Sequence, residues 1–392
     1  MMKKISSLVI GIALVLISVS NQFALAAPDD GYPQGVAAPG RTCPDSPVGE
    51  KTVSSFSGKT LICTAMEGTK KWWIENEPLP PPPPPPPGGP QGSNNSLPVI
   101  THTYSLSKKS QSKMKILKDI AYSDASQSQK LDIYLPKSTN KPPLLIWIHG
   151  GGFMFLDKTV VRFDEGAKFL EKLISSGIAV ASVDYRLASE AKFPAAAQDV
   201  KNAVRFLRAN ASKYGFDASK IGVLGESNGA YLANMIGATG DQDSVFDPKN
   251  TELSSISSKV SFVVDISGNV DFKNMRSNIE KFPCKENIGK KLPEMDNPWF
   301  GSEKLPGVSE TIASANLYPY INSNKELPTF FIVHGTEDCA VSQRESIELH
   351  KFIQDLGGKA ELLLVKNGTH GGATVWAAAI KLTPKLKSAF KS

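Results

Sequence analysis

Cysteine is scarce in this chain of 392 residues, which carries only Cys43, Cys63, Cys284 and Cys339. None of them forms a Cys-x-x-Cys pair, so a zinc site is not expected and we predict no bound metal. Charge of one sign is also lacking, because 44 Lys and Arg residues oppose 38 Asp and Glu residues and leave a net charge of +6. No run rich in Lys and Arg is present, so the composition argues against nucleic-acid binding.

Long apolar runs are absent after the first 26 residues, so no membrane span is expected. Residues 1–26 themselves have the pattern of a secretory signal peptide: Lys3-Lys4, an apolar stretch from Leu8 to Val19, and Ala24-Leu25-Ala26 as the cleavage site. The apolar stretch is shorter than the ~20 residues that span a bilayer, which favours removal over anchoring. The sequence therefore predicts a secreted or periplasmic protein.

Export to an oxidising compartment favours disulfide bonds between the four cysteines. Three connectivities are open. The most economical one joins Cys43 to Cys63 and Cys284 to Cys339, because each pair then lies within one region of the chain.

Proline divides the chain, with eight consecutive prolines from Pro80 to Pro87. Such a run forms an extended, stiff polyproline helix. We therefore expect a linker over residues 78–97, a small module over residues 27–77 and a catalytic domain over residues 98–392. The linker is interpreted as a spacer, with recognition by a partner as the alternative.

The small module contains two β-like stretches, Lys51–Phe56 and Lys59–Thr64, and the adjacent residues Trp72 and Trp73. A core of this size needs support, which a Cys43–Cys63 bridge would supply. The tryptophans are expected either to fill that core or to form a platform that contacts a carbohydrate or another surface.

From Lys113 onward, strand and helix patterns alternate, which predicts an α/β fold with a mostly parallel eight-stranded sheet and helices on both faces. The expected strands are Lys115–Tyr122, Lys130–Leu135, Leu144–His149, Ile178–Tyr185, Lys220–Leu224, Val260–Ile266, Thr329–His334 and Ala360–Val365. The expected helices are Phe163–Ser176, Ala195–Tyr214, Asn228–Ala238, Gln343–Leu356 and Ala373–Phe390. Between Gly268 and Leu327, after the sixth strand, no periodicity persists, which indicates an insertion placed to cap an active site.

A Gly-x-Ser-x-Gly motif, residues 225–229, lies between the strand that ends at Leu224 and the helix-like stretch that follows. This arrangement is typical of a nucleophile elbow, in which glycines permit a tight turn and the serine, here Ser227, is exposed. A serine hydroxyl needs a base to accept its proton.

Only five histidines can supply that base: His102, His149, His334, His350 and His370. His370 is the candidate, because it lies in a glycine-flanked loop directly after the last strand, where catalytic residues of open α/β sheets lie. The others fall near the linker, at strand ends or within a helix pattern.

An acid is needed to orient the base. Asp338 follows a strand and gives the order Ser227, Asp338, His370, which is the order of the α/β-hydrolases. Glu337 and Asp265 remain alternatives.

Donors for the oxyanion are predicted from His149-Gly150-Gly151-Gly152, where three glycines leave the backbone N–H groups accessible. The N–H groups of Gly151, Gly152 and Asn228 form the predicted oxyanion hole.

Four motifs together resemble the hormone-sensitive-lipase-like esterases of the α/β-hydrolase superfamily: residues 149–153, 184–187, 193–196 and 225–229. The stretch from Tyr185 to Leu232 also resembles bacterial feruloyl-esterase-like and acetylxylan-esterase-like members. The resemblance implies hydrolysis of carboxylic esters by Ser227, Asp338 and His370, without a cofactor. Two positions depart from the family pattern, since Asn228 stands where alanine is usual and Ala230 where a second glycine is common.

The favoured interpretation is a secreted serine carboxylic ester hydrolase that acts on short-chain or polysaccharide-linked acyl esters, such as acetyl or feruloyl groups. The resemblance also implies a longer helical cap before the catalytic region, which is absent before Lys113 and argues against a site for long acyl chains. Two alternatives are a serine peptidase of the same fold and a non-catalytic binding protein on a hydrolase scaffold.

Overall fold

The computed structural model describes residues 51–53, 60–66, 69–74, 102, 104–248, 252–280, 297–301 and 308–391. The chain divides into two units, Met1–Leu97 and Pro98–Ser392. The predicted signal peptide, the linker and Cys43 lie outside the described residues, as does Cys284. Cys339 is described and is not a free thiol, whereas its predicted pairing with Cys284 stays a prediction.

The first unit contains an antiparallel sheet with the strand order β1-β2-β3. Its strands are β1 (Lys51–Val53), β2 (Thr60–Met66) and β3 (Thr69–Ile74). Trp72 lies opposite Cys63 and Trp73 opposite Ile62 in the pairing of β3 with β2. The tryptophans therefore lie on a strand, and their role stays a prediction.

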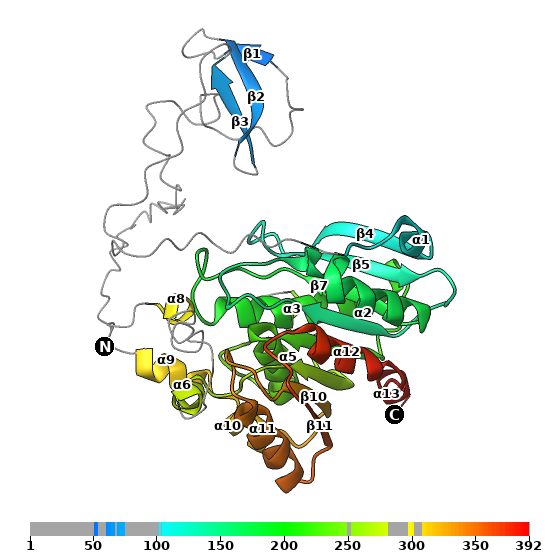
Figure 1. The fold of residues 1–392 in the computed structure, drawn as a ribbon. Coiled ribbons are helices and arrows are strands. Elements are labelled where there is room, and N and C mark those ends of the chain that lie inside the picture. The colour runs from blue at the N-terminus through cyan, green and yellow to red at the C-terminus, as the bar shows by residue number, and fades with distance from the viewer. Residues whose placement is uncertain are drawn as a thin grey trace, which may run out of the picture. The chain divides into compact units, whose positions relative to one another are not determined.

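The second unit is built on an eight-stranded sheet with the order β11-β10-β9-β8-β6-β7-β5-β4 (Figure 1). Only the pairs β4–β5 and β5–β7 are antiparallel, which confirms the predicted mostly parallel sheet. The strands are β4 (Met114–Ala121), β5 (Lys130–Pro136), β6 (Leu144–Ile148), β7 (Ala179–Val183), β8 (Ile221–Glu226), β9 (Phe262–Ile266), β10 (Thr329–Gly335) and β11 (Ala360–Val365).

The burial of each strand depends on its position in the sheet. The central strands β6, β7 and β9 are buried at every residue, as expected where helices cover both faces. The edge strand β11 has no buried residue, and its Leu363 and Leu364 are exposed. Continuous burial therefore marks the strands at the centre of the sheet.

Helices cover both faces of the sheet, in two apolar cores. One core includes side chains of α3 (Ala195–Ala209), α5 (Asn228–Thr239), α10 (Tyr318–Ser323) and α11 (Gln343–Asp355). The other includes side chains of α2 (Asp164–Ser175), α12 (Ala373–Lys381) and α13 (Thr383–Ala389). The remaining short helices before the insertion are α1 (Lys108–Gln111), the 3₁₀ helix η1 (Lys158–Arg162) and α4 (Ala211–Tyr214).

Two helices predicted as continuous are divided. The first breaks at Asn210, between α3 and α4, where the side-chain amide donates to the carbonyl of Phe206. The second breaks at Leu382, between α12 and α13. Pro384 follows directly and has no N–H to donate to the preceding turn, so the longer helix cannot continue unchanged.

The insertion after β9 contains short helices: α6 (Phe272–Glu280), α8 (Asn297–Phe300) and α9 (Val308–Ser314), followed by α10. They are too short, and too often interrupted by proline, to produce a lasting sequence period. Trp299 of α8 is fully buried and stacks on Phe153 of the glycine-rich loop, with 3.8 Å between the ring centroids. The insertion thus packs against the loop that was predicted to bind an oxyanion.

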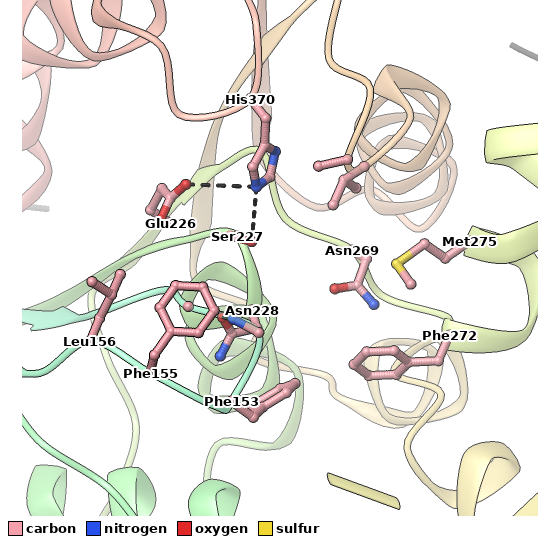
Figure 2. Close-up of a pocket in the computed structure, with 14 residues that line it drawn as sticks. Phe153, Phe155, Leu156, Glu226, Ser227, Asn228, Asn269, Phe272, Met275 and His370 are labelled. Carbon is pink, nitrogen blue, oxygen red and sulfur yellow. Dashed lines mark hydrogen bonds and ion pairs between the residues drawn. The ribbon is translucent and has the colours of Figure 1, made fainter. Parts of the chain in front are cut away.

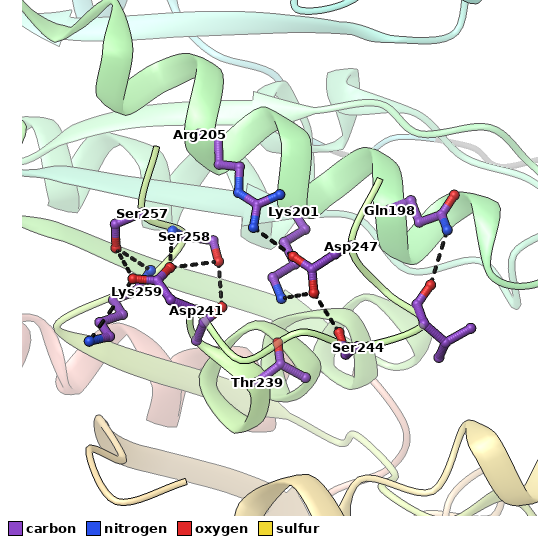
Figure 3. Close-up of polar contacts among 12 residues, drawn as sticks. Gln198, Lys201, Arg205, Thr239, Asp241, Ser244, Asp247, Ser257, Ser258 and Lys259 are labelled. Carbon is purple, nitrogen blue, oxygen red and sulfur yellow. Dashed lines mark hydrogen bonds and ion pairs between the residues drawn. The ribbon is translucent and has the colours of Figure 1, made fainter. Parts of the chain in front are cut away.

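The loop after α5 is held to α3 by buried charges (Figure 3). Asp247 accepts hydrogen bonds from Lys201 Nζ at 2.7 Å and from Arg205 Nη2 at 2.6 Å. The Lys201 side chain is 0% exposed and that of Arg205 is 6% exposed, so neither cation has water as a substitute partner. We call Asp247, Lys201 and Arg205 the scaffold cluster.

Candidate active site

Ser227 is the single residue between β8 and α5, and it has φ of +56° and ψ of −127°. A positive φ is unusual for a residue with a side chain and marks a constrained turn. The Ser227 N–H donates to the carbonyl of Ile266 at 2.9 Å, which fixes the turn to the end of β9. The strand–turn–helix context that a nucleophile elbow requires is therefore present.

The glycines at the two ends of the motif leave room for this turn. A Cβ on Gly225 would overlap the carbonyl of Gly229, and a Cβ on Gly229 would overlap the carbonyls of Ile148 and His149. No residue with a side chain fits at either position without moving the backbone, so the motif serves the geometry of the turn.

His370 lies over Ser227, with its Nε2 2.9 Å from the serine Oγ (Figure 2). Its Nδ1 is 2.8 Å from Oδ2 of Asp338. Ser227 follows β8, Asp338 follows β10 and His370 follows β11, so the ends of three parallel strands bring the three side chains together. We call Ser227, His370 and Asp338 the site row.

Asp338 is fully satisfied as an acceptor. Its Oδ1 accepts the N–H groups of Ala340 and Val341 at 2.9 Å each, and its Oδ2 lies 3.2 Å from His334 Nε2. Burial by itself would raise the pKa of Asp338, but the charge of His370 and the hydrogen bonds from both histidines hold that pKa well below its ordinary value. The carboxylate therefore stays ionised next to His370.

Glu337 and Asp265, the alternatives to Asp338, do not hydrogen-bond to His370 within the described residues. Glu337 is exposed. Asp265 is buried, where its Oδ1 accepts the N–H of Gly268 at 2.8 Å and its Oδ2 accepts Asn234 Nδ2 at 2.7 Å.

Glu226 is a charged neighbour of the site row that was not singled out from the sequence. Its Oε1 is 3.8 Å from His370 Nε2 (Figure 2). Burial would lower the pKa of His370, yet the charges of Asp338 and Glu226 raise it above its ordinary value. Its position directly before Ser227 is the sequence feature that could have identified Glu226 as a neighbour of the site.

None of the other four histidines hydrogen-bonds to Ser227 within the described residues, although His334 contacts Asp338. His149 is buried and stacked on Tyr185, and burial lowers its pKa to about 4. His334 binds Ser346 and the carbonyl of Val341, and His102 pairs with Asp164. His350 lies within α11, as its helix pattern predicted.

The predicted oxyanion donors have unequal surroundings. The N–H of Gly152 donates to Oδ1 of Asn228 at 2.6 Å, so it is engaged in this structure. The Asn228 Nδ2 donates to the Tyr185 hydroxyl at 3.0 Å, and that hydroxyl donates to the carbonyl of His149 at 2.9 Å. Within the described residues, the N–H groups of Gly151 and Asn228 have no hydrogen-bond acceptor.

A cavity of about 250 Å³ opens beside Ser227 and His370 (Figure 2). Its wall is mainly apolar and includes Phe153, Phe155, Leu156, Phe272, Met275 and Val341. The described residues contain no group of acidic, histidine or cysteine side chains that could hold a metal ion. In the same part of the chain, every helix is too short or too polar to cross a membrane.

A family model described as BD-FAE matches residues 131–353, which is more than half of the chain. The chain belongs to the BD-FAE family.

Curated proteins similar to this BD-FAE chain are named as esterases. A probable isoprenylcysteine alpha-carbonyl methylesterase of Arabidopsis thaliana, ICMEL1, is 26% identical over 65% of this chain and 51% of its own length. Esterase LipC of Mycobacterium tuberculosis is 28% identical over 69% of this chain and 65% of its own length. The chain thus spans between half and two thirds of the length of these two relatives.

Solved structures share the fold. One titled as a truncated carbohydrate esterase from gut microbiota has a TM-score of 0.61 and 25% identity, and the match covers 73% of this chain and 100% of that one. A bifunctional GH43-CE protein of Bacteroides eggerthii has a TM-score of 0.57 and 29% identity, over 69% of this chain and 35% of that one. These likenesses support the α/β-hydrolase fold and the esterase resemblance predicted from the motifs.

The cavity wall of this BD-FAE chain also contains residues that sequence reasoning missed. Asn269, Phe272 and Met275 come from the insertion after β9, where the sequence has no sustained period. Their approach to Ser227 depends on how short helices pack, so no local pattern could have identified them.

Proposed function

We propose that this chain is a serine carboxylic ester hydrolase in which Ser227 is the nucleophile, His370 the general base and Asp338 the orienting acid. The observation that carries the proposal is the continuous row from Ser227 Oγ to His370 Nε2 at 2.9 Å and from His370 Nδ1 to Asp338 Oδ2 at 2.8 Å. The row ends at an apolar cavity, where a substrate carbonyl can approach the hydroxyl.

In the first half of the reaction, His370 takes the Ser227 proton while Oγ attacks the ester carbonyl. The carbonyl oxygen becomes an oxyanion, which the N–H groups of Gly151 and Asn228 are free to bind. His370 then gives its proton to the alcohol oxygen as the ester C–O bond breaks, leaving an acyl group on Ser227.

In the second half, His370 takes a proton from water as the water oxygen attacks the acyl carbonyl. The Ser227 C–O bond breaks, the serine recovers its proton from His370, and the carboxylic acid leaves. The ionised Asp338 stabilises the imidazolium in both halves.

The proposed substrates are short-chain or polysaccharide-linked acyl esters. A cavity of about 250 Å³ with aromatic walls suits a small acyl group better than a long chain. The esterase names of the relatives, and the carbohydrate esterase title of a solved structure with the same fold, support this class.

Substitution of Ser227 by alanine tests the proposal. Hydrolysis of p-nitrophenyl acetate should fall by about 10⁴-fold or more, because no other hydroxyl stands in the row. Thermal unfolding of the variant should match that of the parent, which separates lost chemistry from lost structure. Turnover retained at the parent rate would contradict the proposal, and faster cleavage of matched peptides than of esters would indicate a peptidase instead.

We also propose export to the periplasm or beyond, cleavage after residue 26, disulfides Cys43–Cys63 and Cys284–Cys339, and carbohydrate contact through Trp72 and Trp73. The signal-like pattern of residues 1–26 and the even number of cysteines support export and pairing. Mass mapping of the mature protein should find an N-terminus at Ala27 and both linked peptides. An intact Met1 or four free thiols would contradict these assignments.

A further inference from the structure

Asn269 is a polar side chain in the cavity wall that the proposed reaction does not use. The residue is 3% exposed and lines the cavity together with Ser227 and His370. Figure 2 shows its amide between Ser227 and the apolar pair Phe272 and Met275. Its buried Nδ2 has no hydrogen-bond partner within the described part of the chain.

An unpaired buried amide is costly, because it has given up water and received nothing in exchange. Other buried polar atoms also lack partners, among them those of Ser267, Trp299 and Tyr318. Of the buried side chains with an unpartnered polar atom in the described residues, only that of Asn269 lines the cavity beside Ser227. A molecule in this cavity can therefore supply the missing bond.

The turn that carries Asn269 is held in place. Asp265 accepts the N–H of Gly268 at 2.8 Å, and the Ser267 N–H donates to the carbonyl of Val333 at 2.9 Å. These bonds fix the backbone on the N-terminal side of Asn269 to the ends of β9 and β10. The amide is thus presented by a rigid turn, which is what a group that recognises a substrate requires.

The chemistry of the amide points to the group that it would bind. A primary amide offers N–H donors and a carbonyl acceptor, and a half-turn about the last side-chain bond exchanges the two. A hydroxyl also donates and accepts. The surrounding wall is apolar, with Phe272 and Met275 as neighbours, so a substrate hydroxyl at this point would find its polar partner in Asn269.

We propose that Asn269 determines specificity by hydrogen-bonding a hydroxyl group of the substrate, so that hydroxylated esters are preferred over esters with a methyl group in its place. The proposal rests on the proposed ester hydrolysis at Ser227. The hydroxyl can belong to the acyl part or to the alcohol part of the ester. Both sources share the chemistry, and the test distinguishes them.

The test compares two matched pairs of esters with the full chain. For the acyl part, p-nitrophenyl 3-hydroxybutyrate is compared with p-nitrophenyl 3-methylbutyrate. For the alcohol part, 2-hydroxyethyl acetate is compared with propyl acetate. In each pair, a methyl group replaces a hydroxyl of similar size, so the ratio of the kcat/KM values isolates the hydroxyl.

In the parent enzyme, the hydroxyl member of one pair should be favoured by about 10- to 100-fold, the effect of leaving a buried polar group unpaired. In Asn269→Leu, which replaces the amide by an apolar group of similar size, that ratio should approach one. Met275→Leu is the matched control, because it alters the same wall without a polar group and should leave the ratio intact.

Ratios that are the same in the parent and in Asn269→Leu, for both pairs, would overturn the proposal. If Asn269→Leu does not fold, Asn269→Ala is measured in the same way and the same ratios decide. Failure of the proposed function gives a different result, since the parent would then hydrolyse no member of either pair.

Discussion

The site row and the scaffold cluster are both built around a carboxylate, but they differ in what lies at their ends. In the scaffold cluster, Asp247 is bonded to Lys201 and Arg205, whose side chains are 0% and 6% exposed. In the site row, the Asp338 side chain is 0% exposed against 14% for Asp247, yet the row ends at the Ser227 hydroxyl beside a cavity. One cluster closes on itself and the other opens toward a substrate.

This difference separates stability from chemistry. Opposite charges within the scaffold cluster pair with one another and hold the loop after α5 on α3, while the buried Nε of Arg205 has no partner among the described residues. Next to the site row, the N–H groups of Gly151 and Asn228 and the Asn269 amide lack partners among the described residues. Groups left unpaired cost stability and are available to bind a reacting molecule.

The largest effect is expected from His370→Ala. Removal of the base should lower kcat for p-nitrophenyl acetate by about 10⁴-fold, because the Ser227 proton then has no acceptor within hydrogen-bond distance. Because the variant also removes one partner of the buried Asp338 carboxylate, the unfolding midpoint in urea should fall, and kcat is therefore measured on protein shown to be folded. An activity loss below tenfold would contradict the assignment.

The scaffold cluster should show the opposite behaviour. Asp247→Asn leaves Lys201 and Arg205 buried without a counter-charge, so we expect a loss of about 3 kcal/mol in the free energy of unfolding. Activity of the folded protein should be unchanged. Urea unfolding measures the loss of stability. A loss below about 1 kcal/mol would show that water replaces Asp247 as the partner of the two cations.

Asp241→Asn is the matched control for that variant. Asp241 is 36% exposed and lies 4.0 Å from Lys259, whose side chain is 52% exposed. Its Oδ1 also accepts the Ser258 N–H at 2.7 Å, a bond that the asparagine oxygen can keep. Water can replace the exposed Lys259, so the loss of stability should be about 1 kcal/mol or less.

Glu345 joins α11 to α6 of the insertion and makes the stability of the protein depend on pH. It lies in α11 and accepts Asn278 Nδ2 of α6 at 2.8 Å, and burial raises its pKa from 4.5 to about 7. Between those two values, the unfolded chain loses this proton while the folded chain keeps it. Stability should therefore fall as pH rises from 4.5 to 7, by about 3 kcal/mol, and stay level above.

Glu345→Gln keeps the bond from Asn278 and removes the titrating group. Urea unfolding at pH 5 and pH 8 should show the variant more stable than the parent at pH 8 and similar to it at pH 5. Equal pH dependence in the two proteins would contradict the raised pKa.

The smallest effect is expected from Asn228→Ala. The variant removes the link from the Gly152 N–H to the Tyr185 hydroxyl, which should cost about 1 kcal/mol of stability. Because the Gly152 N–H becomes free to bind an oxyanion, kcat for p-nitrophenyl acetate should not fall. Tyr185→Phe is the control, since it breaks the same link and leaves Gly152 engaged. A tenfold fall in kcat for Asn228→Ala would show that its side chain positions the loop instead.

Much of the fold could be predicted because buried parallel strands are continuous apolar runs. Leu144–Ile148 differs by one residue from its predicted bounds. The edge strand Ala360–Val365 has no buried residue, yet its bounds are as predicted because residues 362–365 are also an apolar run. The proximity of Ser227 and His370 also follows from order along the chain, since the ends of parallel strands meet at one edge. Their catalytic roles stay a proposal.

The rest depends on contacts between segments that are distant in sequence. Nothing near Phe272 or Met275 indicates that they face Ser227, because short helices in the insertion leave no period. The bond from Gly152 to Asn228 joins residues 76 positions apart and involves a side chain that the resemblance marked only as a departure. Such details required the three-dimensional arrangement.

The most direct test of the account is to label the folded protein with a fluorophosphonate and map the modified peptide by mass spectrometry. The account predicts one label per chain, on Ser227, with labelling strongly reduced in His370→Ala, because the reagent reacts with an activated serine. A folded parent protein that takes up no label, or takes it up at another residue, would contradict the claim that Ser227 is the nucleophile.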